Sequence, residues 1–164
     1  MAIFMKVAGV DGESFIKGRE SWIEVLSFQW MVGRNLNSIG SSVDLKTTGK
    51  GAARFEFQGI QITKTVDSAS NPLFLAAARG DVIQPVILEF TGMGVQSTGP
   101  EVVRVRYRLG KVIIASIEQA GTGSDLRLLE TLTLQFGSFV CEYANQAGTP
   151  VNVAGWDVAL ARAI

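Results

Sequence analysis

Histidine is absent from this sequence of 164 residues, and cysteine occurs once, as Cys141. Without histidine there can be no Ser-His-Asp or Cys-His nucleophile pair, no histidine general base and no histidine metal ligand. A single cysteine excludes a disulfide within the chain and a cysteine-rich zinc site. Cys141 lies in the strand-like run FVCEY, so we interpret it as a small core or sheet residue rather than a reactive thiol.

Net charge is also lacking, because Lys plus Arg and Asp plus Glu both number 15. A neutral chain has no general attraction for nucleic acid or an anionic membrane, and its copies repel one another little. No window approaches 18 consecutive apolar residues, so we expect no membrane insertion. The N-terminus MAIFMKVAGVDGES lacks the order of a signal peptide, which predicts a cytoplasmic starting point.

Motifs for phosphate and metal binding are missing too. Lys50 is followed by Gly51 rather than by the Ser or Thr of a P-loop, and Gly92-Met-Gly94 lacks the third glycine of a dinucleotide fingerprint. The turn 121–125 carries one carboxylate, too few for a calcium loop. An enzyme would need a pair of carboxylates, and nothing in the sequence supports one. We therefore expect no catalytic, cofactor-binding or metal-binding residue.

What the chain does have is apolar content, with 47% hydrophobic residues and a mean hydropathy of +0.25. Either a dense core or a surface that meets another chain would account for it. Alternating runs predict a succession of strands, at 2–8, 22–32, 53–63, 84–91, 102–119 with a bend at Gly110, 126–136, 139–144 and 151–158, followed by a short tail.

One helix signal interrupts the strands, with Asn71 as N-cap, Pro72 in the first turn, Arg79 in the last turn and Gly80 at the C′ position. The apolar character of this helix predicts that it packs on a sheet. No linker or internal repeat divides the sequence. These elements predict one mainly β domain over residues 1–164, an antiparallel barrel or sandwich with an appended helix at about residues 70–79.

The run 22–32 has two faces, and we expect the bulkier one to point into the core. This face comprises Glu24, Leu26, Phe28 and Trp30. The opposite face comprises Ile23, Val25, Ser27 and Gln29.

The segment Gly33–Gly51 is long and rich in Gly, Ser, Thr and Asn. Loops of this length are uncommon in compact domains. It is either a surface loop or an arm that becomes ordered on contact with a neighbouring copy, in which case deleting Asn37–Thr47 should weaken assembly. The candidate contact residues are Asn37, Ser38, Ser41, Ser42, Asp44, Lys46 and Thr47.

Three arginines, Arg104, Arg106 and Arg108, share one face of a predicted strand. Such a stripe can contact nucleic acid, but the neutral chain favours ion pairs instead. We expect partners such as Glu89, Glu118 or Glu130, on the same subunit or across a subunit interface.

Four motifs occur in order along the chain. Together they resemble the motifs of the Hcp family, the haemolysin-coregulated tube proteins of type VI secretion systems. The first is Gly12-Glu13-Ser14 followed by WIEVLSFQW at 22–30. The second is TKTVD at 63–67 with Ala69, Ser70, Pro72 and Leu73. The third is LETLTLQF at 129–136, and the fourth is GWD at 155–157.

The resemblance implies a small β-barrel with one flanking helix, whose copies form six-membered rings that stack into a tube. It implies a structural protein with no catalytic residue or cofactor. Its partners would be further copies of itself and the sheath, spike and secreted effector proteins. Assembly would be cytoplasmic, followed by secretion without a cleaved signal peptide.

By the same resemblance, the strand at 22–32 lines the channel of the ring, with Ser27 and Gln29 facing cargo. The alternatives are a phage or tailocin tail tube protein and, from a different class, a small-ligand-binding β-barrel.

Overall fold

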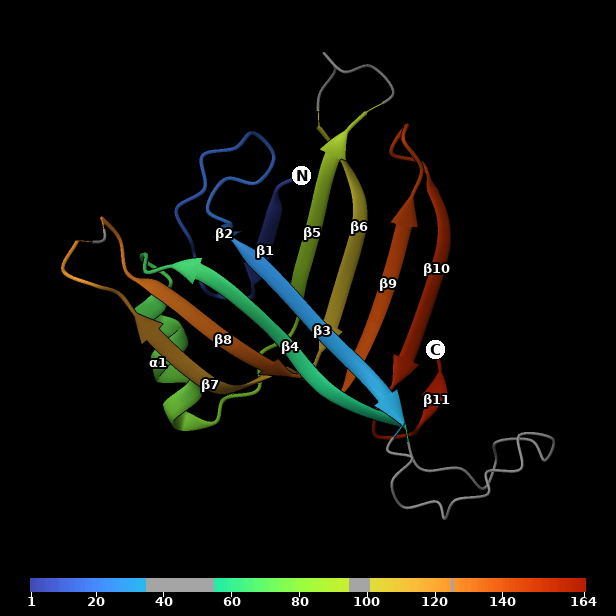
Figure 1. Ribbon diagram of the computed structural model, residues 1–164. Helices are drawn as coiled ribbons and strands as arrows, with labels where there is room; N and C mark the ends of the chain where they lie inside the picture. The colour runs from blue at the N-terminus through green and yellow to red at the C-terminus, as the bar shows by residue number, and fades with distance from the viewer. Residues whose placement is uncertain (35–54, 95–100, 125) are drawn as a thin grey trace, which may run out of the picture.

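The computed structural model describes residues 1–34, 55–94, 101–124 and 126–164 (Figure 1). These residues form two antiparallel sheets that pack face to face, with one helix at the end of the barrel. The seven-stranded sheet has the order β11 (Arg162–Ala163), β10 (Pro150–Asp157), β9 (Ser138–Ala144), β6 (Glu101–Gly110), β5 (Val86–Met93), β1 (Ile3–Val7) and β2 (Ile23–Val25). The four-stranded sheet has the order β3 (Ser27–Arg34), β4 (Phe55–Thr65), β8 (Leu129–Gln135) and β7 (Ile113–Ala120).

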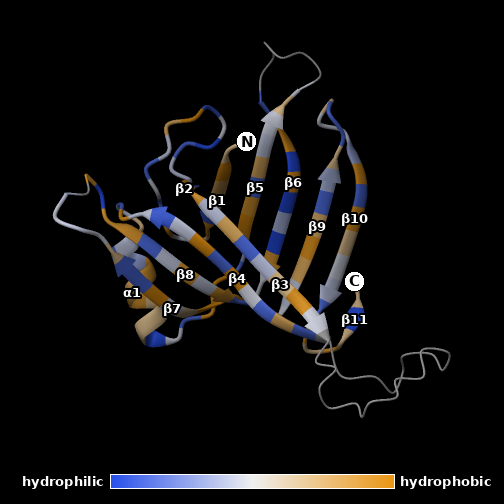
Figure 2. Ribbon diagram, in the orientation of Figure 1, coloured by the Kyte–Doolittle hydropathy of each residue, from blue (hydrophilic) through white to orange (hydrophobic). Residues whose placement is uncertain are grey.

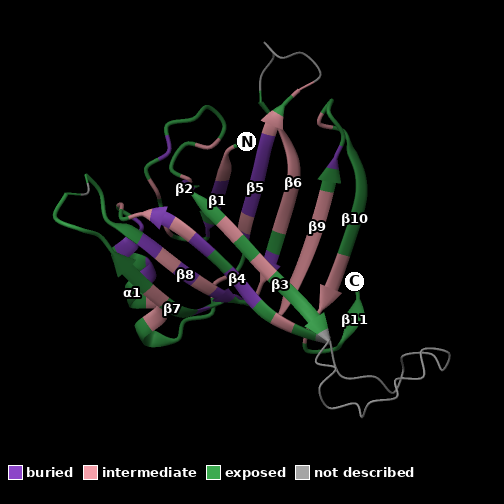
Figure 3. Ribbon diagram, in the orientation of Figure 1, coloured by how far each residue is buried: buried purple, intermediate pink, exposed green. Residues whose placement is uncertain are grey.

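The core lies between the two sheets. Apolar and polar residues alternate in the middle of β4 and β8 (Figure 2), and the apolar ones there are buried (Figure 3), whereas Leu129 at the start of β8 is exposed. Ile60, Ile62 and Leu132 of the four-stranded sheet are fully buried, as are Met5 and Leu88 of the seven-stranded sheet. The predicted antiparallel β-barrel of two packed sheets with a flanking helix is therefore confirmed.

Aromatic rings fill the space between β3 and the seven-stranded sheet. The Phe28 ring lies 4.8 Å from Phe90 and 5.7 Å from Tyr107, and the Trp30 ring lies 5.4 Å from Tyr107 and 5.0 Å from Phe139. The Phe28–Tyr107 pair is stacked and the other three pairs are edge-to-face, and both arrangements stabilise beyond the area that the rings bury. This aromatic cluster joins the two sheets.

The predicted strand 22–32 is wrong as a single element. It breaks at Leu26 into β2, which pairs with β1, and β3, which pairs with β4. Because the chain changes sheet at this corner, the alternation of inward and outward residues also shifts. Ile23 and Val25 are buried, whereas Leu26 is 58% exposed and only Phe28 and Trp30 of the predicted core face pack against the core.

The predicted strand 102–119 likewise divides between the sheets. β6 ends at Gly110, where a bend was expected, and β7 begins at Ile113 in the other sheet. The predicted C-terminal tail contains a further short strand, β11, because a turn held by the Leu160 N–H donating to Asp157 Oδ1 (2.8 Å) returns the chain to β10.

The helix α1 spans Ser70–Arg79, as predicted, but its N-cap is Ala69 rather than Asn71. No described side chain caps the first turn of α1. Side chains bond the backbone just before it, because the Ala69 N–H donates to Asp67 Oδ1 (3.0 Å) and the Asp67 N–H donates to Ser70 Oγ (3.1 Å). At the other end Gly80 has φ +70° and its N–H bonds the carbonyls of Ala76 and Ala77, as expected for C′ glycine.

Candidate functional site

A band of polar side chains covers the outer face of the four-stranded sheet. Pairing across the sheet places its residues in two rows, one of Ser27, Thr63, Thr131 and Glu118 and one of Gln29, Gln61, Thr133 and Ser116. These eight residues form what we call the polar band. Thr63 Oγ1 and Thr131 Oγ1 are 3.2 Å apart. Glu118 is the only one of the eight with a charge, so the band offers hydroxyl and amide groups rather than a charged surface.

Ser27 and Gln29, the two predicted channel residues, are exposed and begin these two rows. None of the other six residues was predicted from the sequence to line a channel, and Glu118 was named only as a partner for the arginine stripe. A signal for four of them exists, because Gln61 and Thr63 alternate with buried Ile60 and Ile62, and Thr131 and Thr133 alternate with buried Leu132 and Leu134. The sequence alone does not reveal that these strands are neighbours.

The arginine stripe lies on the outer face of the seven-stranded sheet, within a ladder of alternating charges. Arg106 bonds Glu89 at 2.8 Å and Glu142 at 3.2 Å, and Arg108 reaches Glu142 at 3.5 Å. Arg19, from the loop between β1 and β2, contacts the other oxygen of Glu89 at 2.9 Å. The expected pairing with Glu89 is confirmed.

Within one chain, the expected pairings of the arginine stripe with Glu118 and Glu130 are wrong, because both carboxylates belong to the four-stranded sheet. Pairing with Glu118 of a neighbouring copy stays a prediction. Partial burial acts to lower the pKa of Arg106, but its hydrogen bonds and charge interactions with Glu89 and Glu142 outweigh burial and raise the pKa. Arg104 donates its Nε–H to the carbonyl of Ala144 at 3.4 Å. Ion pairs of Arg106 and Arg108 thus form within one chain, and an interface role for the stripe stays a prediction.

A second polar cluster is enclosed beneath α1. Lys64 and Glu130 are both fully buried, with Nζ 3.3 Å from Glu130 Oε1 and 2.6 Å from Asp67 Oδ1. Ser70 donates to Glu130 Oε1 at 3.1 Å, and Gln119 Nε2 donates to Glu130 Oε2 at 2.7 Å. This cluster joins α1 to β4, β7 and β8. Because its two central charges, Lys64 and Glu130, are fully buried, we assign the cluster a structural role: it fixes the passage from β4 to α1.

Cys141 is half-buried on β9, as expected for a sheet residue. Burial raises the pKa of its thiol, so the thiol is protonated at neutral pH and is a poor nucleophile. Among the described residues, no three His, Cys, Asp or Glu side chains gather where a metal ion could be held. No helix in the described part of the chain has the length and hydrophobicity needed to cross a membrane.

The seven predicted loop residues, Asn37, Ser38, Ser41, Ser42, Asp44, Lys46 and Thr47, lie outside the described residues.

Comparison with known proteins gives one family. The family model described as "Type VI secretion system effector, Hcp" matches residues 4–143. Hcp1 from Salmonella typhimurium is 26% identical, with a TM-score of 0.76, over 99% of this chain and 98% of its own.

A second solved structure, a type six secretion system protein, is 24% identical, with a TM-score of 0.82, over 99% of each chain. A type VI secretion system effector from Yersinia pestis is 20% identical, with a TM-score of 0.74, over 95% of this chain and 99% of its own. No curated protein matches the chain.

Proposed function

Because the chain belongs to the Hcp family of type VI secretion system tube proteins, we propose that six copies close into a ring and that rings stack into the inner tube. The observation that carries this proposal is the family match over residues 4–143, supported by likeness to Hcp1 over nearly the full length of both chains. In this role the protein is structural and catalyses no reaction.

The free edges of the four-stranded sheet support ring closure. Within the described residues, β3 and β7 each pair with one neighbour, so each leaves one edge open. Neighbouring strands in the order β3-β4-β8-β7 are antiparallel, which makes β3 and β7 antiparallel to each other. The β7 edge of one copy can therefore continue the antiparallel pattern on the β3 edge of the next, without a partner of another kind.

In such a ring we assign the polar band to the channel wall. The four-stranded sheet would form a continuous inner wall, and its outer face, with Ser27 and Gln29, would face the lumen. Hydroxyl and amide groups bind many surfaces weakly rather than one tightly, because they offer hydrogen bonds without a fixed charge pattern. A wall of this kind suits the passage of varied effector proteins.

The remaining parts of the proposal follow from membership of the secretion system. The partners are further copies of the chain, together with the sheath, the spike and secreted effectors. We propose assembly in the cytoplasm and export without a cleaved signal peptide. A phage or tailocin tail tube protein is the neighbouring alternative, and sheath and spike genes beside this gene, rather than capsid and portal genes, would decide between them.

The test of ring formation is the mass of the purified full-length protein by light scattering coupled to gel filtration. We expect about six times the mass of one subunit, 17.6 kDa, and ring-shaped particles by negative-stain microscopy. A single-subunit mass at high concentration would overturn the proposal and favour the ligand-binding barrel. The aromatic cluster already argues against that alternative, because it occupies the space between the sheets where an apolar ligand would bind.

A further inference from the structure

The seven-stranded sheet extends beyond the four-stranded sheet at one end of the barrel. There β9 and β10 stand clear of the free edge of β3, as Figure 1 shows at the right. Register with β6 assigns Cys141 and Tyr143 to the inner face of this extension, together with Asn152 and Ala154 of β10. We call these four residues the overhang. Tyr143 is 45% exposed, and Asn152 and Ala154 are exposed as well, although they face the layer that the four-stranded sheet occupies elsewhere.

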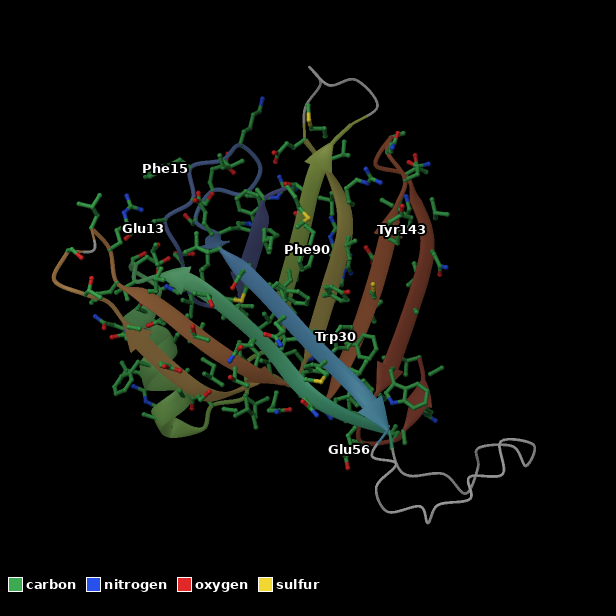
Figure 4. The ribbon with its side chains drawn as sticks, in the orientation of Figure 1. Glu13, Phe15, Trp30, Glu56, Phe90 and Tyr143 are labelled. Atoms are coloured by element: carbon green, nitrogen blue, oxygen red, sulfur yellow. The ribbon has the colours of Figure 1, made fainter. Side chains whose placement is uncertain are left out.

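β3 covers the start of β9 through Trp30 but does not extend over the overhang. The Trp30 ring centroid lies 5.0 Å from that of Phe139, the second residue of β9. Tyr143 lies further along β9, at the upper end in Figure 4, away from β3. The overhang is thus an inward-facing, uncharged surface that lacks a second layer within the described chain.

The opposite end of the barrel carries a matching surface on α1. The helix lies beside β7, at the left of Figure 1, and fills the space between the sheets with Leu73. Asn71, Phe74 and Ala78 are exposed along the side of the helix that borders β7, and they are spaced three and four residues apart, so they form one ridge. Phe74 is 59% exposed. A groove between this ridge and β7 is lined by Ala115 and Ile117.

We propose that α1 of one copy packs beneath the overhang of the next copy, with the Phe74 ridge against Tyr143 and Ala154. This inference rests on the proposed ring and names the second contact that would close it. If β7 of one copy pairs with β3 of the next, then α1, which lies on the inner side of β7, comes to lie just beyond the free edge of β3. This is the space over the overhang, where the next copy has no second layer of its own. A single head-to-tail placement then joins both the sheet edges and the two uncharged surfaces.

Charge supports this match. Neither the Phe74 ridge nor the overhang includes a charged residue, whereas the outer face of the same strands carries Glu142 in the charge ladder. Uncharged surfaces pack without the cost of removing charges from water. An aromatic side chain held on a rigid helix is also the kind of residue that dominates binding at interfaces.

Cross-linking between copies tests the contact. In the full-length protein with Cys141→Ser, we would introduce Phe74→Cys together with Ala154→Cys and add a short bismaleimide. The two positions lie at opposite ends of one copy, so a link between them joins two copies. The matched control pairs Phe74→Cys with Val153→Cys, because Val153 is next to Ala154 but points to the outer face and is exposed.

We expect a ladder of covalent oligomers up to the closed ring for the Ala154 pair, and no ladder above the single-cysteine background for the Val153 pair. Light scattering of the same samples, before cross-linking, separates the two proposals. If rings form but the Ala154 pair gives no ladder, or if both pairs give equal ladders, the packing of α1 beneath the overhang is wrong. The proposal of a ring would be unaffected by that result. A single-subunit mass without a ladder would overturn both.

A charged variant gives an independent readout. Phe74→Asp would place a carboxylate between uncharged surfaces at every subunit boundary, so we expect the ring mass to fall to that of single subunits at concentrations where the parent protein forms rings. Since Phe74 is exposed in one copy, the variant should keep the circular dichroism of the parent. Rings of unchanged mass and stability would contradict the inference.

Discussion

Single residues decide the stability of the polar cluster under α1. Lys64 and Glu130 are buried without access to water, which is costly for two charges unless they remain paired and hydrogen-bonded. Asp67, Ser70 and Gln119 supply the remaining partners within 3.1 Å. All buried hydrogen-bonding groups of the cluster thus have partners. Removing one member leaves the others buried without that partner.

We therefore predict that Glu130→Gln lowers the free energy of unfolding by about 3 kcal/mol, because Lys64 keeps Asp67 but loses its buried counter-charge. Urea denaturation of the purified protein measures this. Glu118→Gln is the matched control, since Glu118 lies on the exposed side of the same sheet, and it should change stability by less than about 0.5 kcal/mol. Equal effects of the two substitutions would contradict the structural role of the cluster.

Ionisation of the Tyr107 phenol should lower the stability of the folded protein at alkaline pH. Desolvation in the aromatic cluster, and then the neighbouring Cys141, raise the pKa of this phenol from 10.0 to about 12. In the unfolded chain the phenol ionises near pH 10, while the folded protein resists ionisation until about pH 12. Stability from this group is therefore complete below pH 10 and is lost as the pH rises through 12.

The corresponding experiment follows the free energy of unfolding between pH 9 and pH 12. Tyr107→Phe should reduce the slope in this window, because phenylalanine has no proton to release, while the ring contacts with Phe28 and Trp30 persist. An unchanged slope in the variant would show that other groups set the alkaline limit.

At the scale of elements, two glycines with positive φ shape the helix and the strand that carry the candidate surfaces: Gly80 ends α1 and Gly59 lies in a bulge of β4. Gly80 ends α1 with φ +70°, and a Cβ added there would meet nothing within 4 Å. Gly59 has φ +83° at the bulge where Gln58 and Gly59 of β4 lie opposite Met31 of β3. A Cβ at Gly59 would come within 2.8 Å of the Leu134 carbonyl oxygen.

Alanine substitutions should therefore rank in a fixed order. Gly80→Ala should cost about 1 kcal/mol, from the left-handed backbone alone. Gly59→Ala should cost more, about 2 kcal/mol or above, because steric overlap with β8 adds to the same backbone strain. Gly33→Ala, with no positive φ and open space around its Cβ, is the control with little effect. Thermal denaturation of the three variants tests the order, and a reversed order of Gly59 and Gly80 would contradict it.

At the scale of the whole molecule, charge is distributed unevenly between the two outer faces. The ladder of Arg19, Glu89, Arg106 and Glu142 runs across the seven-stranded sheet, whereas the polar band on the four-stranded sheet has one carboxylate. If the polar band lines a channel, a charge added there is repeated in every subunit and concentrated in the lumen.

Gln29→Arg should therefore leave rings intact but change what they retain. We expect purified rings of the variant to hold acidic model peptides more strongly than basic ones, with a preference that falls as salt is added. Filtration of rings with labelled peptides measures retention. Thr149→Arg, in the exposed turn between β9 and β10, is the control for the added charge. Loss of the ring in Gln29→Arg would instead identify the position as part of an interface.

The sequence by itself determined which of the described segments become strands and where α1 lies. Alternation marked β1, β4, β5, β8, β9 and β10 because the two faces of each strand meet different surroundings, and Gly80 ended α1 because the C′ position needs a left-handed residue. The absence of histidine excluded whole classes of chemistry, because no other side chain is an ordinary proton acceptor near neutral pH. The ordered motifs indicated the family, and Ser27 and Gln29 lie on an exposed face, as their alternation with Phe28 and Trp30 indicated.

Tertiary structure decided how these elements are shared between the sheets. The alternating run around Leu26 and the run around Gly110 each continue across a corner, and local periodicity does not distinguish a long strand from two strands in different layers. Likewise, Glu142 and not Glu118 or Glu130 pairs with the arginine stripe because β9, far away in the sequence, lies next to β6. The polar band and the overhang depend on such non-local neighbours, since strand order is set by packing of the sheets and not by any one segment.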